Sequence, residues 1–309
     1  MVHRNLSARR WIFPSLFTLS FVLLQSGQTF AFVSVPSRPQ VLQSSKSQCR
    51  QQDTNQVPQR SHDMRSALAA AKKATGTYMD ALSSAASEAL GREVSLESSR
   101  GGGYSGGGGA STSAVTDKVS GDKFFVKAAS GGSDMLRAEY MGVKEMSDTN
   151  TIRVPKPVAF GEHENRAFVI FEYLEFTGGG SQYELGNQLA KMHRKISDKG
   201  FGFHVDNTIG ATPQPNTWEP TWPDFWDKHR LGHMLKLTGN AGLGKEKVEE
   251  LREKTRELLS HNPEPSLIHG DLWGGNKGFV KDGDHVVPCI FDPATYYGDR
   301  EADVAMTYV

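Results

Sequence analysis

Residues 267–276 read Leu-Ile-His-Gly-Asp-Leu-Trp-Gly-Gly-Asn. The stretch starts in an apolar run and continues into a segment that contains three glycines. Asp271 and Asn276, five residues apart, place a carboxylate and a carboxamide in this Gly-rich loop. A carboxylate can accept a proton from a hydroxyl, and carboxylate and amide oxygens are the ligands that hard cations such as magnesium prefer. The stretch therefore predicts reactive groups at the end of a buried strand.

The spacing of Asp271 and Asn276 is typical of a kinase catalytic loop, whose pattern is Asp-x-x-x-x-Asn. Phosphoryl transfer needs a carboxylate that orients the attacking hydroxyl and oxygen ligands that hold magnesium on the phosphates. Asp292, sixteen residues after Asn276, ends the apolar run Cys-Ile-Phe-Asp and could supply a second ligand. Each signal is weak alone, since an aspartate after a strand is usually a turn residue or a helix cap.

The upstream sequence strengthens the kinase interpretation. Residues 122–130 predict a short strand that contains Lys127. Ser133 and Asp134 then predict the cap of a helix that contains Glu139. Residues 153–176 predict two strands joined by a turn at His-Glu-Asn-Arg. A strand with lysine, a helix with glutamate and a hairpin follow one another as in the N-lobe of a kinase.

Lys127 and Glu139 are separated by a strand end, a short loop and two turns of helix, so they can form an ion pair. This ion pair would hold the lysine in place for the nucleotide phosphates. The alternative for Lys127 is a strand-end lysine that points into solvent. Residues 171–176 would form the hinge, with the backbone of Glu172, Tyr173 and Leu174 lining the adenine pocket. The alternative here is the end of an apolar strand.

Residues 99–115 are rich in glycine and include Gly101, Gly102 and Gly103. By composition this stretch is a flexible linker, but a glycine-rich loop can also fold over phosphates. The kinase-like order of the elements that follow favours the phosphate loop.

The remaining patterns predict an α+β fold. Residues 183–195 form an expected helix with His193 near its end, where a histidine more often packs or caps than binds a ligand. Residues 222–235 and 245–260 are helical by periodicity, whereas residues 201–218 are irregular. A helix is also expected from His62 to Leu90, with Gly91 as its stop.

Composition bounds the chain further. The 309 residues carry 35 basic and 35 acidic side chains, which gives no argument for a nucleic-acid partner.

Arg9 and Arg10 precede a short apolar run, and a serine- and glutamine-rich stretch without acidic residues follows it, as in a signal peptide joined to a transit peptide. We expect a targeting leader over residues 1–62 that directs the protein to a plastid, with plain secretion as the alternative. No stable membrane association is expected once the leader is removed. Cys289 has no expected partner and reads as a core residue of a strand.

The stretch at 267–276, residues 290–306 and the pattern of Trp and Gly in residues 201–231 together resemble the fructosamine-3-kinase family, also called ketosamine kinases. The resemblance covers roughly residues 81–309. Trp273 and the triplet Asp292-Pro293-Ala294 separate this family from choline kinases and aminoglycoside phosphotransferases, which share the His-Gly-Asp and Asn positions.

The resemblance implies a bilobal, protein-kinase-like fold. Its N-lobe, residues 63–171, has an antiparallel sheet with one key helix, and its C-lobe, residues 172–309, is mainly helical. Family members continue for tens of residues past the helix that contains Glu-Ala-Asp-Val-Ala-Met, so we expect further C-terminal helices to be missing. The chain also has Gly101-Gly102-Gly103-Tyr104 where many eukaryotic members have a cysteine.

The implied activity is ATP-dependent phosphorylation of the 3-hydroxyl of a ketosamine, a ribulosamine or fructosamine, on a glycated lysine, after which the 3-phosphate is lost spontaneously. Asp271 would be the base, Asn276 and Asp292 would hold Mg²⁺, and Lys127 would bind ATP. Trp273 would stack on the sugar or amine, or only pack the loop. Substrates would be glycated proteins or small ketosamines. The alternatives are a small-molecule kinase of the choline or aminoglycoside type and an inactive, truncated pseudokinase.

Overall fold

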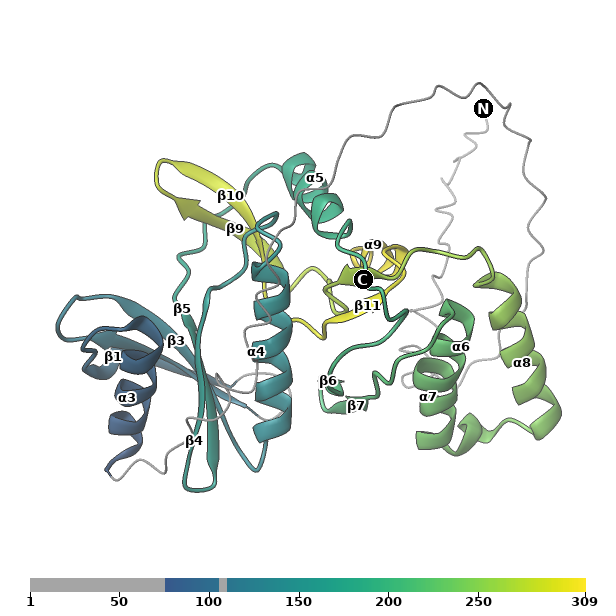
Figure 1. Ribbon diagram of the computed structural model, residues 1–309, viewed down its shortest axis with the longest axis horizontal. Helices are drawn as coiled ribbons and strands as arrows, with labels where there is room; N and C mark the ends of the chain where they lie inside the picture. The colour runs from purple at the N-terminus through teal and green to yellow at the C-terminus, as the bar shows by residue number, and fades with distance from the viewer. Residues whose placement is uncertain (1–75, 106–109) are drawn as a thin grey trace, which may run out of the picture.

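The computed structural model describes residues 76–105 and 110–309. The expected leader at 1–62 lies outside the described residues, as do residues 106–109 of the glycine-rich stretch. Figure 1 shows the N-terminal sheet with its helices at one end of the molecule and helices α6 (Trp222–Trp226), α7 (Gly232–Leu237) and α8 (Lys245–Leu258) at the other. The predicted α+β class is confirmed by this arrangement.

The N-terminal part is built on an antiparallel sheet of five strands in the order β1-β2-β3-β5-β4. The strands are β1 (Leu96–Ser105), β2 (Ser111–Asp117), β3 (Lys123–Ser130), β4 (Pro157–His163) and β5 (Arg166–Glu172). The predicted strand with Lys127 and the predicted hairpin are both confirmed. His163 pairs with Arg166, so Glu164 and Asn165 form the tight turn between β4 and β5.

Strand β5 is buried on both faces, because alternate side chains of a strand point to opposite sides of the sheet. Phe168 and Ile170 pack in one core with helix α3 (Tyr78–Leu90). Val169 and Phe171 pack in a second core with helix α4 (Ser133–Ser147). The two helices therefore cover opposite faces of the sheet (Figure 1).

Of the helix predicted over residues 62–90, residues 62–75 lie outside the described residues. Within the described residues helix α3 begins at Tyr78, and Thr77 is its N-cap and forms a capping box with Asp80. Gly91 ends α3 in the left-handed conformation, as predicted.

The predicted cap of α4 is wrong. Its N-cap is Gly132, which has no side chain to cap the helix, whereas Ser133 and Asp134 already lie in the first turn. A carboxylate in the first turn still interacts favourably with the helix dipole.

The C-terminal part contains the predicted helices together with three two-stranded sheets, of which the sequence predicted only the buried strand before Asp271 and the strand with Cys289. The helices are α5 (Gln182–Met192), α6 (Trp222–Trp226), the π-helix η2 (Asp227–Leu231), α7 (Gly232–Leu237), the 3₁₀-helix η3 (Gly239–Gly242), α8 (Lys245–Leu258) and α9 (Glu301–Met306). The strands are β6 (Asn207–Ile209), β7 (Thr212–Gln214), β8 (Ser266–Ile268), β9 (Lys277–Asp282), β10 (His285–Ile290) and β11 (Tyr296–Gly298), which pair as β6–β7, β8–β11 and β9–β10.

Buried amides order the irregular segment 201–218. Asn207 donates through Nδ2 to the carbonyl of Thr295 at 2.9 Å. Gln214 donates to Oδ1 of Asn207 at 2.9 Å and to the carbonyl of Ala294 at 3.4 Å. These hydrogen bonds attach the β6–β7 hairpin to the backbone that follows Asp292, so the hairpin is ordered by side-chain contacts and not by a repeating pattern.

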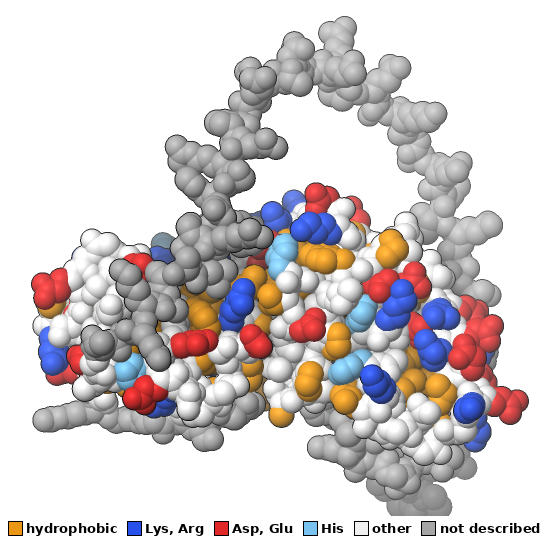
Figure 2. All heavy atoms as spheres, turned by 60° about the horizontal axis from the view of Figure 1, so that its bottom comes forward, with side chains coloured by type: hydrophobic (Ala, Val, Ile, Leu, Met, Phe, Trp, Pro, Cys, Tyr) orange, Lys and Arg blue, Asp and Glu red, His pale blue; other side chains and the backbone are white. Residues whose placement is uncertain are grey.

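Cys289 is fully buried, as expected for a core residue of β10. On the face shown in Figure 2, acidic and basic side chains are interspersed. Within the described residues, none of the helices combines the length and apolar character needed to cross a bilayer.

Candidate functional site

Lys127 and Glu139 form a buried ion pair, as predicted. Alternation along β3 turns Lys127 toward the face that α4 covers, and Lys127 Nζ lies 2.7 Å from Glu139 Oε1. Each side chain is only 12% exposed. Burial alone would lower the pKa of Lys127, but the negative charges of Glu139 and Asp292 outweigh it and raise this pKa. Lys127 is therefore positively charged at neutral pH.

Asp292 also forms an ion pair with Lys127, through its Oδ1. It follows β10 by two residues and adopts a φ of 60°, a left-handed conformation that aspartate tolerates better than most residues. Its side chain is 49% exposed, so its carboxylate has one side on the lysine and another open to a ligand. Lys127 thus lies between a carboxylate from α4 and one from the loop after β10.

Asp271 and Asn276 contact each other across the loop that follows β8. The Asn276 Nδ2 donates to the Asp271 backbone carbonyl at 2.9 Å and to its Oδ2 at 3.0 Å. The same amide nitrogen donates to the backbone carbonyl of Asp292 at 3.3 Å. One carboxamide therefore joins the two segments that contain the predicted carboxylates.

The environment of Asp271 changes its acidity. Burial, and after it the negative charge of Asp292, raise the pKa of Asp271 to about 6, although the hydrogen bond from Asn276 acts in the opposite direction. A carboxyl group with a raised pKa accepts a proton more readily than an ordinary aspartate, which suits a general base near neutral pH.

Gly270 allows the loop to turn sharply before Asp271. Its φ is 81°, and a Cβ at this position would lie 2.2 Å from the carbonyl oxygen of Ala294. Any other residue would push apart the segments that contain Asp271 and Asp292, so the glycine in the His-Gly-Asp pattern has a steric reason.

The donor set fits magnesium. The three acceptors around Asn276 Nδ2 fix the orientation of the amide, which leaves Oδ1 as the atom that can bind a cation. The same amide nitrogen contacts the backbone carbonyl of Asp292, whose carboxylate is 49% exposed. An amide oxygen and a carboxylate oxygen, with remaining positions for water and phosphate, match the ligands that magnesium takes in phosphotransferases.

A buried network that the sequence reasoning missed supports the loop. Asp303 on α9 accepts hydrogen bonds from the backbone amides of His269 at 2.8 Å and Gly270 at 2.9 Å, and from His193 Nε2 at 2.9 Å. Burial alone would raise the pKa of Asp303, but the hydrogen bond and charge of His193 and the contacts with His269 lower it overall. A charged Asp303 therefore fixes the backbone two residues before Asp271.

His269 has a defined tautomer in this network. Its Nε2 donates to the carbonyl of Phe291 at 2.9 Å, so its Nδ1 is free to accept the Asp271 amide at 3.2 Å. Burial lowers the pKa of His269, which keeps the ring neutral.

The interpretation of His193 as a packing residue is also confirmed, since it is buried and contacts Asp303. The sequence held one indication for Asp303. It lies next to Ala302 and three residues before Met306, and these three residues form the buried face of α9.

The predicted hinge residues lie at the end of β5. The Glu172 side chain pairs with Arg153 at 2.5 Å. The Glu172 amide donates to the carbonyl of Lys156 at 2.9 Å, and the Tyr173 amide lies 3.4 Å from the carbonyl of Lys123. The backbone donors of Glu172 and Tyr173 are therefore engaged within the protein, which leaves the Leu174 amide as the donor that these three residues can offer a ligand.

The other predicted site residues lie in two places. Gly101, Gly102 and Gly103 form part of strand β1, where Gly103 pairs with Ser113, so this section of the glycine-rich stretch is not an interdomain linker. Trp273 is 46% exposed and its ring covers Gly275, where a Cβ would lie 2.3 Å from the indole. The exposed part of the ring leaves an apolar surface two residues from Asp271.

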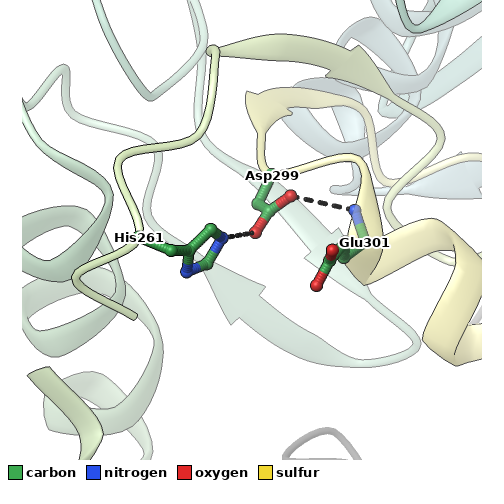
Figure 3. Close-up of side chains that lie close together, drawn as sticks. All are labelled: His261, Asp299 and Glu301. Carbon is green, nitrogen blue, oxygen red and sulfur yellow. Dashed lines mark hydrogen bonds and ion pairs between the residues drawn. The ribbon is translucent and has the colours of Figure 1, made fainter. Parts of the chain in front are cut away.

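Figure 3 shows a separate group of possible metal ligands, formed by His261, Asp299 and Glu301. The Asp299 carboxylate is already engaged, since it contacts His261 Nε2 at 2.8 Å and accepts the Glu301 amide at 3.0 Å. These contacts tie the segment after α8 to the start of α9, and we assign the group a structural role.

A buried lysine between two carboxylates, next to a carboxylate held by a carboxamide, is the arrangement of groups that nucleotide-dependent phosphotransferases use. The sequence comparison identifies the family. The chain belongs to the fructosamine kinase family, whose sequence profile matches residues 79–309.

Three relatives illustrate the similarity. A candidate ketoamine kinase of Synechocystis is 42% identical over 189 residues, which cover 60% of this chain and 63% of the relative. The chloroplastic protein-ribulosamine 3-kinase of Oryza sativa subsp. indica is 44% identical over 205 residues, 63% of this chain and 59% of the relative. The crystal structure of a candidate fructosamine-3-kinase from Haemophilus somnus 129PT has a TM-score of 0.62 at 26% identity and covers 73% of this chain and 75% of that one. The chain thus spans about three fifths of the length of these two curated relatives.

Proposed function

We propose that this protein is an ATP- and Mg²⁺-dependent kinase that phosphorylates the 3-hydroxyl of ketosamines on glycated lysines and thereby leads to deglycation. The observation that carries the proposal is the joint placement of Lys127, Glu139 and Asp292 beside Asp271 and Asn276. The kinase-like bilobal division belongs to the proposal, with residues 63–171 as the N-lobe and 172–309 as the C-lobe.

ATP would bind between the two lobes. The charged Lys127, held by Glu139, would bind the α- and β-phosphates. The Leu174 amide would donate to the adenine, with Glu172 and Tyr173 lining the same edge, because the amides of those two residues are engaged in the protein. Gly101, Gly102 and Gly103 would cover the phosphates from strand β1, where the absence of side chains permits close approach of the backbone.

Asn276 Oδ1 and the Asp292 carboxylate would hold magnesium. When bound, the ion neutralises charge on the β- and γ-phosphates. With Asp292 serving as a metal ligand, the ammonium group of Lys127, which contacts Asp292 in this structure, would be available to the nucleotide phosphates.

Asp271 would be the base of the reaction. Its carboxylate orients the 3-hydroxyl and takes its proton as the hydroxyl oxygen forms a bond to the γ-phosphorus, while the bond from that phosphorus to the bridging oxygen of ADP breaks. The Asn276 amide holds the Asp271 carboxylate in place, and Asp303 fixes the backbone that precedes it. The raised pKa of Asp271 makes it a better proton acceptor than an ordinary aspartate.

The substrate class rests on the family and on the loop. Relatives of this chain are described as ribulosamine and ketoamine kinases, which favours a ketosamine over another alcohol. The exposed ring of Trp273 would stack on the sugar or its amine beside the base. The rice relative is described as chloroplastic, which supports a plastid location for this protein.

The test is a panel of alcohols incubated with the full chain, ATP and Mg²⁺. We expect ADP formation with ribulosyl-lysine and fructosyl-lysine and none with choline or kanamycin. ADP formation with choline or kanamycin alone would replace the proposed substrate, and absence of turnover with every acceptor would favour a pseudokinase. Omission of Mg²⁺ serves as the matched control.

A further inference from the structure

Helix α4 contacts both parts of the molecule along a single stripe. Glu139, Gly142 and Glu145 follow one another at three-residue spacing, which places them on neighbouring turns of one helix face. Glu139 contacts Lys127 on the sheet, as described above. Gly142 and Glu145 contact the C-terminal part, so the same stripe joins the sheet to the C-terminal part. Figure 1 shows α4 between the sheet and the elements of the C-terminal part.

The contact of Glu145 is a hydrogen bond to a buried tyrosine. The Tyr297 hydroxyl donates to Glu145 Oε1 at 2.6 Å. Burial, together with the hydrogen bond to Glu145 and the charge of that carboxylate, raises the pKa of Tyr297. The phenol therefore stays protonated and remains a donor under all working conditions.

Tyr297 is firmly attached to the C-terminal part. It lies on β11, pairs with Leu267 of β8, and exchanges backbone hydrogen bonds with Gly202 at 2.8 and 3.0 Å. Its ring is 4% exposed and lies 5.9 Å from the ring of Trp218. The hydroxyl is therefore a fixed point against which the helix can be held.

The middle of the stripe touches the segment that contains Asp292. A Cβ at Gly142 would lie 2.7 Å from Thr295 Oγ1, so the helix backbone lies directly on the residue three positions after Asp292. Close packing at Gly142 limits how far α4 can move inward, and the bond to Tyr297 limits how far it can move outward. The hydroxyl of Tyr297 thus acts as a donor from the C-terminal part to a side chain of this stripe.

We propose that the Tyr297 hydroxyl is a positioning group that holds α4 inward, so that Glu139 stays on Lys127 and keeps the lysine ready for the nucleotide. This inference rests on the proposed function for the role of Lys127. Loss of the hydroxyl frees the end of α4 that contains Glu145 and lets Glu139 withdraw from Lys127.

The test uses Tyr297→Phe in the full chain, which removes the hydroxyl and keeps the ring. We expect the Kd of Mg-ATP to rise about three- to tenfold, the net effect of one typical intramolecular hydrogen bond. Tyr308→Phe is the matched control, because Tyr308 is 86% exposed, and it should leave the Kd unchanged. Glu145→Gln should retain the wild-type Kd, since the amide oxygen still accepts the bond, whereas Glu145→Ala should match Tyr297→Phe.

Coupling separates positioning from a general loss of stability. In a Glu139→Gln background, Tyr297→Phe should raise the Kd of Mg-ATP no further, because the ion pair through which it acts has already been weakened. An unchanged Kd for Tyr297→Phe in the wild-type background, or an equal rise in both backgrounds, would overturn the inference.

A second measurement does not need nucleotide. In the protein without ATP, Tyr297→Phe should increase hydrogen exchange of the α4 amides by about threefold or more, and Glu145→Gln and Tyr308→Phe should not. Unchanged exchange in Tyr297→Phe would refute the inference even if wild-type protein failed to bind Mg-ATP, a result that by itself would refute only the proposed function.

Discussion

Replacement of Gly142 by alanine tests whether α4 is packed as closely on the C-terminal part as the structure indicates. The added methyl group would lie 2.7 Å from Thr295 Oγ1 and 2.9 Å from Thr295 Cβ, well inside ordinary van der Waals contact. Gly186, inside α5, is the matched control, because a Cβ there meets nothing within 4 Å.

The two variants should change stability in opposite directions. Alanine in place of glycine inside a helix stabilises by about 0.5–1 kcal/mol, which is the whole expected effect of Gly186→Ala. At Gly142 the same gain is opposed by overpacking, which costs about 1–3 kcal/mol. The net effect of Gly142→Ala is then a loss of up to about 2.5 kcal/mol. The difference between the variants, about 1–3 kcal/mol, corresponds to roughly 2–4 °C in Tm for each kcal/mol in a domain of this size.

Thermal and urea unfolding, followed by circular dichroism, measure both variants against the wild type. Gly142→Ala should also weaken Mg-ATP binding, because displacement of α4 moves Glu139 away from Lys127. If Gly142→Ala were as stable as Gly186→Ala, the close contact between α4 and Thr295 would be wrong, and with it the steric half of the α4 argument.

Three further predictions follow from other contacts. Lys127→Ala leaves Glu139 and Asp292 as two carboxylates without their shared cation, and we expect Mg-ATP affinity, measured by calorimetry, to fall by about tenfold or more; an unchanged affinity would remove Lys127 from the nucleotide site. Trp273→Ala should raise the KM for ribulosyl-lysine several-fold and leave the Kd of Mg-ATP unaltered, and an equal KM would reduce the indole to a cover for Gly275. For Asp227, burial acts to raise the pKa, but the ion pairs with Arg252 and Arg256 outweigh it and lower this pKa. The pKa in the folded state is therefore below that in the unfolded state. The stabilisation from these ion pairs is present above about pH 4 and is lost as the pH falls below it. Asp227→Asn should therefore be about 1–3 kcal/mol less stable at pH 7, with the gap narrowing toward pH 3, and a gap independent of pH would contradict this.

The part of the site that could be predicted from the sequence is the part with a fixed spacing. Lys127 and Glu139 are twelve residues apart and meet because a strand, a short loop and two helical turns bring them together. Asp271 and Asn276 share one loop, so their contact also follows from spacing alone. The order of elements also predicts the sheet, because β5 appears in the sequence as a short continuous apolar run that is typical of a strand buried on both faces.

The supporting contacts could not be predicted because they join distant segments without a period. Asp303 meets His193 across 110 residues, and Tyr297 meets Glu145 across 152. Asn207 and Gln214 donate to backbone carbonyls, which every residue type has. The residue types at the accepting positions therefore cannot reveal these contacts. The N-cap at Gly132 was missed for a local reason, since serine and aspartate are favoured both as caps and in the first turn.

We propose that Asp271 is the base that directs phosphoryl transfer to a ketosamine. The most direct measurement compares wild type and Asp271→Asn for formation of the 3-phosphate of ribulosyl-lysine, followed by phosphorus NMR, with Mg-ATP affinity measured on the same samples. We expect kcat to fall by about 10²- to 10⁴-fold in Asp271→Asn, with Mg-ATP affinity nearly unchanged. Full turnover by Asp271→Asn, or phosphate transfer to another position of the sugar, would contradict it.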